Sequence, residues 1–190
     1  DEGGFGWLDI DGGLDSDANL QLWINARMTY VFALAHLAGD RSAGSRADNL
    51  GLAEHGIRAL ASFHDDEHGG WYAEIDIDGA PAQTGKFCYE HAFVLLAACA
   101  ASAAGAEGAD ELLEEAALVH RTRFWDSRAA RCREEWNRDW SELDGYRGAN
   151  SNMHSVEAYL FAADVTGDDT WRQRALAICE RIIGIHARGH

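Results

Sequence analysis

Residues 64–79, HDDEHGGWYAEIDIDG, and residues 84–103, TGKFCYEHAFVLLAACAASA, decide the fold of this chain. The first segment has the Gly–Gly–aromatic start and the Asp–Gly end of a β-hairpin. The second is apolar on nearly every side, which is typical of a buried helix. Residues 111–125, ELLEEAALVHRTRFW, have apolar and charged residues at helical spacing and therefore predict an amphipathic helix.

The same order of elements returns on both sides of this stretch. Before it, GGFGWLDIDGG (residues 3–13) predicts a short strand or hairpin, and after it WDSRAARCREEWNRDW (residues 125–140) occupies the corresponding position. Apolar residues at helical spacing predict further helices over residues 19–38, 47–63, 149–165 and 170–185. Gly39 follows the first of them and is expected to cap its C-terminal end.

This order of elements is an internal repeat. Gly4, Gly70 and Ala130 mark equivalent points that lie 66 and 60 residues apart, and the repeat divides the chain into units 1–63, 64–125 and 126–190. The apolar helix of each unit should lie inside and the amphipathic helix outside. We therefore predict an all-α toroid of paired helices with short β-hairpins, in one domain, whose inner helices line a central pocket. An open helical array is the alternative.

Composition and charge limit the possible functions. The chain has 190 residues and a formal net charge of −16, so it should repel nucleic acids. Its four cysteines (Cys88, Cys99, Cys132 and Cys179) contain no CxxC pair, and we interpret them as reduced thiols of a cytoplasmic protein. No signal peptide is visible and the apolar runs are too short for a membrane span, so no membrane partner is expected.

The densest polar cluster lies on the helix expected over residues 149–165. Asn150, His154 and Glu157 are spaced i, i+4 and i+7, so one face of the helix carries all three. This face is typical of the wall of a polar pocket, whereas the alternative is a buried Asn/His pair that satisfies backbone groups. A metal site is a further alternative, but no second histidine stands at i+4, and we expect no metal.

Two other predicted inner helices carry polar residues among apolar ones. Trp23, Arg27 and Tyr30 share a face, and an arginine among aromatic residues needs an anionic or oxygen-rich partner. An ion pair with a nearby carboxylate is the structural alternative. Tyr89 and His91 stand two residues apart, so one of them at most can face the pocket. For His91 we favour a hydrogen bond to a loop.

At this point the motifs GGFGWL, LWINARMTYVFALA, HGGWYAEID, KFCYEHAFVLLAA and YRGANSNMHSVEAYL resemble the N-acylglucosamine 2-epimerase superfamily, in its branch of mannose and sulfoquinovose isomerases. The resemblance covers essentially the whole chain in order. It implies an (α/α)6 barrel and the interconversion of mannose-like aldoses and ketoses (mannose and fructose) by proton transfer through an enediol. Epimerisation at C2 is the alternative. It implies a monosaccharide substrate and no metal or redox cofactor.

The same resemblance implies roles for individual residues. The substrate-binding residues are Arg27, Tyr89, Asn150 and His154, with His154 as the catalytic candidate. The resemblance also implies that Glu157 orients His154 or the helix, while His91 and Trp23 are supporting candidates from their helix positions alone. Removing a proton beside a carbonyl needs a base that works near neutral pH, and histidine has that property. Arg27 and Asn150 are suitable donors to an enediolate oxygen.

The chain departs from the family in one respect. Family members are about twice as long and have six helical hairpins, whereas three are counted here, and the blocks with the two principal acid/base histidines of the family are missing. We therefore expect about half of a toroid, completed by self-association or by a C-terminal half. A non-catalytic sugar-binding or assembly module is an alternative. So is a glycoside hydrolase using Glu134 and Glu135, which we interpret instead as a solvated charged turn.

Overall fold

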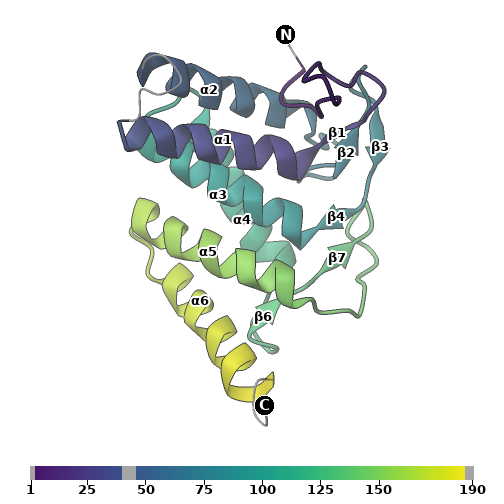
Figure 1. The fold of residues 1–190 in the computed structure, drawn as a ribbon. Coiled ribbons are helices and arrows are strands. Elements are labelled where there is room, and N and C mark those ends of the chain that lie inside the picture. Colours follow the sequence, from purple (N-terminus) through teal and green to yellow (C-terminus); the bar gives the residue numbers. More distant parts are fainter. Residues whose placement is uncertain (1–2, 40–45, 187–190) are drawn as a thin grey trace.

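The structure is a computed structural model that describes residues 3–39 and 46–186. Within these residues the chain forms six α-helices and seven short strands (Figure 1). The helices are α1 (Leu22–Leu37), α2 (Arg46–Ser62), α3 (Cys88–Ala104), α4 (Ala109–Val119), α5 (Ala149–Thr166) and α6 (Thr170–Arg181). The strands are β1 (Leu20–Gln21), β2 (Glu74–Ile75), β3 (Pro81–Gln83), β4 (Lys86–Phe87), β5 (Trp125–Asp126), β6 (Arg131–Cys132) and β7 (Glu135–Trp136).

The helices form two layers. α1, α3 and α5 pack side by side, while α2 packs on α1, α4 on α3 and α6 on α5. Figure 1 shows that α1, α3 and α5 run in the same direction, with their first turns on the side of the molecule where the strands lie. The predicted arrangement of inner and outer helices is confirmed. The three pairs do not close into a ring within the described residues.

The core is centred on α3. Between Cys88 and Ala101, twelve residues of this helix are buried, and Tyr89 and Glu90 are the exceptions. The helix is buried because α1, α4 and α5 surround it. This explains why its sequence is apolar without a polar face. α1 and α2 approach each other closely at Gly56, where an added Cβ would lie 1.9 Å from Oγ1 of Thr29. A residue larger than glycine at position 56 would force these two helices apart.

The short strands connect successive helix pairs. β1 pairs with β2, which also pairs with β3, and β4 pairs with β7. In these antiparallel ladders Leu20 is opposite Ile75 and Lys86 is opposite Trp136. Strands of one unit therefore bond to strands of the next, rather than only within one hairpin.

The prediction of a strand or hairpin over residues 3–13 is wrong. This segment is a loop with a single bridge between Leu8 and Leu14. The side chain of Asn25, on α1, takes the place of a second strand. Its Oδ1 accepts a hydrogen bond from the backbone N–H of Phe5 at 2.7 Å, and its Nδ2 donates to the carbonyl oxygen of Phe5 at 3.1 Å. The loop is therefore held against α1 by one buried amide.

Several predicted helix boundaries are also corrected. Residues 20–21 and 86–87, which the helical spacing included, are extended strands because their pairing partners lie far along the chain. The helix expected over 111–125 ends at Val119 and continues as a π-helical turn, His120–Phe124. The last helix ends at Arg181 and also continues as a π-helical turn, Ile182–His186.

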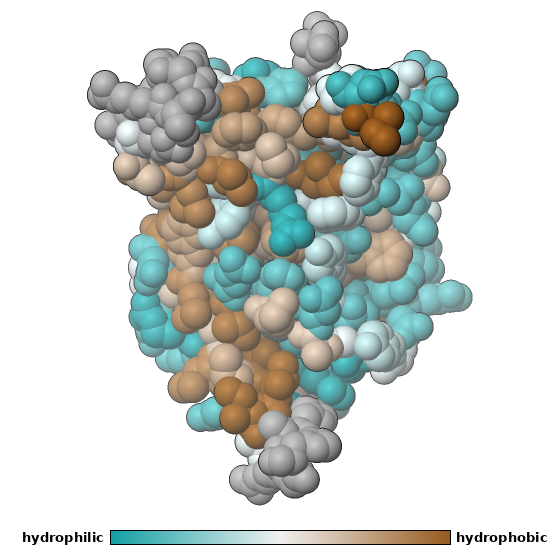
Figure 2. All heavy atoms as spheres, viewed as in Figure 1, coloured by the Kyte–Doolittle hydropathy of each residue, from teal (hydrophilic) through white to brown (hydrophobic). Residues whose placement is uncertain are grey.

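Part of the inner layer is apolar and exposed. Figure 2 shows hydrophobic side chains on the face that carries α1, α5 and α6. The large exposed residues of these helices are Val31, Leu37, Met153, Leu160 and Leu176. A groove of about 540 Å³ lies between α5 and α6. Among residues 3–39 and 46–186, none of the helices has the length and hydropathy that a bilayer crossing requires.

Candidate functional site

The candidate site lies on the inner face, where α1, α3 and α5 come together. The guanidinium carbon of Arg27 (α1) is 4.6 Å from the ring centre of Phe93 (α3). The same Phe93 ring is 4.6 Å from the imidazole of His154 (α5), and the Tyr89 ring is 5.4 Å from that imidazole. Three residues that the sequence analysis selected on different helices, Arg27, Tyr89 and His154, are thus neighbours.

Arg27 presents a cation without a carboxylate partner among the described residues. Its side chain is exposed, and its guanidinium lies over the rings of Phe93 at 4.6 Å and Trp23 at 5.7 Å. The ion pair that we considered as an alternative is absent from the described part of the chain. Stacking uses the face of the guanidinium and leaves its edge donors free, so Arg27 can donate hydrogen bonds to ligand oxygens.

His154 is paired with Glu157 along α5. Nδ1 of His154 lies 3.2 Å from Oε2 of Glu157, and the side chain of His154 is 15% exposed. A carboxylate at Nδ1 favours the tautomer with the proton on Nδ1, which leaves Nε2 as a free base. The pKa of Tyr30 on α1 is raised, mainly by burial and also by the negative charge of Glu157. Glu157 therefore acts on His154 of its own helix and on Tyr30 of α1.

A metal is the competing interpretation of His154 and Glu157. Among the residues that the structure describes, no three His, Cys, Asp or Glu side chains are grouped so that they could hold a metal ion. A protein site for a transition metal usually supplies at least three ligands.

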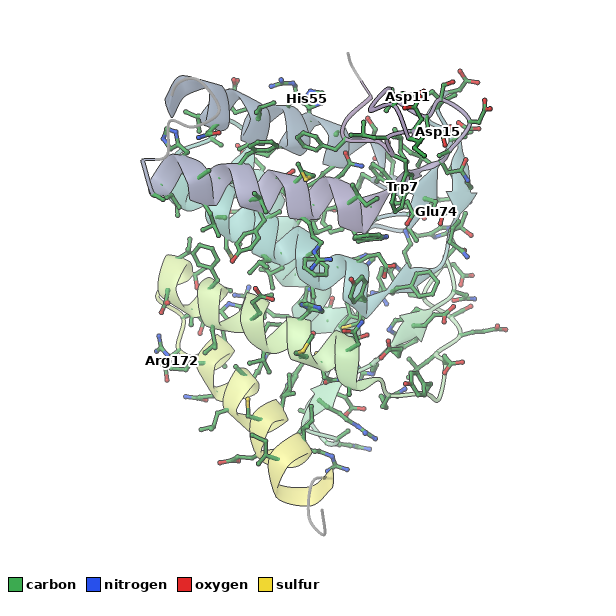
Figure 3. The ribbon with its side chains drawn as sticks, viewed as in Figure 1. Trp7, Asp11, Asp15, His55, Glu74 and Arg172 are labelled. Carbon is green, nitrogen blue, oxygen red and sulfur yellow. The ribbon has the colours of Figure 1, made fainter. Side chains whose placement is uncertain are left out.

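Trp23 lies at the edge of the site. Its indole Nε1 donates to Oε1 of Gln21 at 2.6 Å, and Nε2 of Gln21 donates to Glu74 at 2.9 Å. The Trp7 ring packs edge-to-face on Trp23 at 6.2 Å. Figure 3 shows Trp7 and Glu74 at the same corner, beside the first turn of α1. A hydrogen bond and a ring contact thus hold the indole of Trp23 next to Arg27.

His91 lies in the core and outside this cluster. Its Nδ1 donates to the carbonyl oxygen of Phe87 at 2.7 Å, and its Nε2 accepts from the backbone N–H of Trp71 at 3.2 Å. Burial lowers the pKa of His91 to about 3, so the ring is neutral. Both nitrogens bind backbone groups, and His91 fastens the loop before Trp71 to α3.

Asn150 lies one turn before His154 on α5 and is exposed. It lines the groove between α5 and α6 together with Met153 and Ile182. The structure therefore places Asn150 at the groove between α5 and α6. The alternative of a buried Asn/His pair that serves only the fold does not describe Asn150.

Glu134 is not part of a solvated turn, so that interpretation is wrong. Its carboxylate accepts a hydrogen bond from the backbone N–H of Gly148 at 2.8 Å and another from the hydroxyl of Ser151. Gly148 and Ser151 stand at the start of α5, where backbone N–H groups lack helical partners. Glu134 therefore fixes the beginning of the helix that carries His154.

Phe93 is the member of the cluster that the sequence analysis missed. It follows Tyr89 by four residues and so lies on the same face of α3. The spacing was the available signal, but a phenylalanine in a helix that is apolar all round is normally assigned to the core.

The four cysteines are free thiols, as predicted. Cys88, Cys99 and Cys132 are buried. Burial raises the pKa of Cys99 to about 12. A thiol with such a high pKa is protonated at neutral pH and is a poor nucleophile, so Cys99 serves packing.

Glu90, next to Tyr89, is expected to make stability depend on pH. Burial, supported by the charges of Glu134, Glu135 and Glu74, raises its pKa to about 7, and its Oε2 is buried without a hydrogen-bond partner. The folded state holds this proton more tightly than the unfolded state, so the free energy of unfolding falls as pH rises from about 4.5 to 7. Glu90→Gln should raise the free energy of unfolding by about 1–3 kcal/mol at pH 8 and by much less at pH 5.

Urea unfolding at both pH values measures this effect. Glu114→Gln, at an exposed position of α4, is the matched control and should change little at either pH. An equal gain for Glu90→Gln at pH 5 and pH 8 would contradict the assignment of the raised pKa to Glu90.

Comparisons with known proteins add to this geometry. The model of the family N-acylglucosamine 2-epimerase (GlcNAc 2-epimerase) matches residues 3–190. A D-mannose isomerase of Thermobifida fusca is 49% identical over 178 residues, which are 93% of this chain and 42% of the relative. The crystal structure of a D-mannose isomerase superposes with a TM-score of 0.84 at 30% identity, over 95% of this chain and 45% of that one.

A more distant structural relative is the cellobiose 2-epimerase of Spirochaeta thermophila. It has a TM-score of 0.82 and 26% identity, over 95% of this chain and 47% of that protein. In each comparison the chain spans less than half the length of the relative. The neighbours have the (α/α)6 fold that the helix pairs indicated.

Proposed function

Because the chain belongs to the N-acylglucosamine 2-epimerase family, we propose that it forms the substrate-contacting half of a sugar isomerase that interconverts mannose-like aldoses and ketoses. The observation that carries this proposal is the grouping of Arg27, Tyr89 and His154 around the ring of Phe93. A free guanidinium, a phenol and an oriented imidazole are suited to binding a polyhydroxy compound and to moving one of its protons. The names of the relatives support mannose as the substrate.

The proposed reaction is a proton transfer. A base removes the proton from C2 of the open-chain aldose, the electron pair enters the C1–C2 bond, and the carbonyl oxygen becomes the enediol oxygen. Return of a proton to C1, with loss of the proton from the C2 hydroxyl, gives the ketose. Nε2 of His154, with Glu157 at Nδ1, is a base of the required kind. Arg27 stabilises the negative oxygen of the intermediate.

The direction of the inner helices supports the same charge distribution. α1, α3 and α5 all begin on the side of the strands (Figure 1). Tyr89 belongs to the first turn of α3, and Arg27 and His154 follow within two turns of the start of their helices. The positive ends of three helix dipoles therefore point toward the same side, and of these residues Tyr89, in a first turn, lies where this field is strongest.

The α5–α6 groove supports a second element of the proposal. Its wall is almost wholly apolar, with Met153, Val156 and Ile183 among its residues, and the relatives are about twice as long as this chain. We propose that further helix pairs of the same protein cover this groove and supply the rest of the acid/base machinery. We propose that units 1–63, 64–125 and 126–190 are three repeats of one domain and that the further helix pairs repeat the same unit.

The test uses the full-length product of the gene that encodes this sequence. Its intact mass and sedimentation are measured first, because a mass near 20.8 kDa in a dimer would favour self-association over further helix pairs. The protein is then incubated with D-mannose, and the expected product is fructose. Absence of any mannose–fructose interconversion, in a folded protein of either mass, contradicts the proposed isomerase.

A C2 epimerase is the second candidate, and the likeness to a cellobiose 2-epimerase favours it. The same enediol gives the epimer when the proton returns to the other face of C2. Conversion of glucose to mannose, or of cellobiose to its epimer, without ketose formation would select the C2 epimerase.

Calorimetry separates the remaining alternatives, since heat of sugar binding without turnover indicates a binding module. Release of reducing ends from an oligosaccharide would indicate a hydrolase.

A further inference from the structure

Phe93 contacts all three principal groups of the candidate site. Its ring centre is 4.6 Å from the guanidinium carbon of Arg27, 4.6 Å from the His154 ring centre and 5.1 Å from the Tyr89 ring centre. The side chain is 3% exposed and belongs to α3, the most buried helix of the molecule. Phe93 is therefore a fixed point between two helices that carry polar groups.

Arg27 depends on this ring for its position. An arginine side chain has many rotamers, and at an exposed position it occupies several of them. Among the described residues no carboxylate holds Arg27, and its recorded contacts are the faces of Phe93 and Trp23. The shorter of the two contacts is with Phe93. A cation over an aromatic face is attracted by the quadrupole of the ring, so this contact selects one direction for the guanidinium.

His154 is held by the opposite part of the same arrangement. Glu157 fixes one end of the imidazole through Nδ1, but a single hydrogen bond leaves the ring free to turn about it. The Phe93 ring, inclined at 47°, and the Tyr89 ring, at 79°, limit that rotation. The direction of Nε2 is consequently set by α3 and not by α5 alone.

We propose that Phe93 is a positioning residue, which holds the Arg27 guanidinium and the His154 imidazole at a fixed separation so that donor and base act on the same substrate. This inference rests on the proposed function. Phe93 itself offers no polar atom to the substrate. Its effect is geometric, because a misplacement of a catalytic group by about 1 Å can reduce a rate by about 100-fold.

The test compares Phe93→Leu with Phe93→Tyr in the full-length protein. Leucine keeps an apolar side chain and removes the aromatic face, so kcat should fall by about 10- to 100-fold while KM changes much less. Tyrosine keeps the ring and should restore most of the activity. Phe32→Leu is the matched control, because Phe32 is a half-buried residue of α1 whose ring stacks on Phe5 at 5.6 Å. An equal fall of kcat in Phe32→Leu overturns the inference. So does a rise in KM of Phe93→Leu without a fall in kcat.

A combined variant tests whether Phe93 acts through Arg27. Arg27→Lys retains the charge and loses the planar group that stacks. If the two side chains act as one unit, the double variant Phe93→Leu/Arg27→Lys should lose much less activity than the product of the two single losses. Independent, multiplicative losses contradict the proposed coupling.

A measurement without substrate separates this inference from the proposed function. NMR relaxation of the Arg27 guanidinium and the His154 ring in the free protein should show increased mobility of both groups in Phe93→Leu but not in Phe32→Leu. If the wild-type protein isomerises no sugar, the proposed function fails while this result still decides the role of Phe93. Unchanged mobility of both groups in Phe93→Leu overturns the positioning role of Phe93.

Discussion

Asp65→Asn is expected to lower the free energy of unfolding by about 3–5 kcal/mol, the cost of leaving a buried charge without its partner. Asp65 and Lys86 are both completely buried, and Nζ of Lys86 is 3.0 Å from Oδ2 of Asp65. Arg138 also binds this carboxylate, through Nε at 3.0 Å. In Asp65→Asn, the ammonium of Lys86 would lose its anionic partner and keep a neutral amide oxygen and the ring faces of Tyr72 and Trp140.

A second substitution shows that the buried charge is the cause. Lys86→Met removes the ammonium and keeps the apolar stem, so Asp65→Asn/Lys86→Met should recover most of the stability that Asp65→Asn loses. Asp66→Asn is the control at the next position, where the side chain is 98% exposed and pairs with His64. It should cost less than about 1 kcal/mol. Urea unfolding of the four proteins gives the comparison, and an Asp65→Asn loss below that of Asp66→Asn would refute the prediction.

The same carboxylate has a pH signature. Burial by itself would raise the pKa of Asp65, but the hydrogen bonds from Arg138 and Lys86 outweigh burial and hold it well below its usual range. The unfolded chain therefore takes up this proton first as pH falls. The stability that Asp65 contributes is present above about pH 4 and is lost in stronger acid. Asp65→Asn should have a flatter stability profile on the acid side.

His154→Gln should reduce kcat of the full-length enzyme by about 10²- to 10⁴-fold, the usual contribution of a positioned acid or base. Glutamine has a similar length and a polar end, but it cannot take up a proton at neutral pH.

Arg27→Ala should reduce kcat/KM by about 10²- to 10³-fold, because it removes hydrogen-bond donors to the developing oxyanion. Mannose–fructose conversion at several substrate concentrations measures both.

His55→Gln is the matched control for His154→Gln. Figure 3 shows His55 on α2, beyond α1 from the candidate site, where its ring packs on Phe5. Its turnover should stay within about twofold of the wild type, because surface changes away from the site are nearly neutral. Wild-type turnover in both His154→Gln and Arg27→Ala would remove these residues from the proposed site.

The helices could be predicted from the sequence because their information is local. The spacing of apolar residues located every helix, and Gly39 ends the first one as expected, with φ of +72° and its N–H bonded to the His36 carbonyl. The errors fall where the deciding partner is remote. Lys86 and Phe87 extend the helical pattern, yet they form a strand because Glu135 and Trp136 pair with them and Asp65 binds the lysine.

The candidate site was predicted in part for the same reason. Periodicity places Tyr89 and Phe93 on one face, but it cannot show that this face meets α1 and α5. Spacing showed that Tyr89 and His91 cannot share a face, and the hydrogen bond to a loop that we favoured for His91 is made with the backbone of Trp71. The interpretation of Glu134 failed because the donors that bind its carboxylate, Gly148 and Ser151, lie at the start of the next helix. Residues whose role depends on a distant loop have no local signal.

The strand pairing between units has a consequence for evolution by duplication. β1, before α1, bonds to β2, before α3, and β4, also before α3, bonds to β7, before α5. Removing α3 and α4 with their strands would therefore leave β1 and β7 without these partners. Tandem helical repeats that touch only through helix faces can gain or lose a copy freely. Here the strand pairs add a second contact between neighbouring helix pairs, so loss of the middle pair would also break the β1–β2 and β4–β7 ladders.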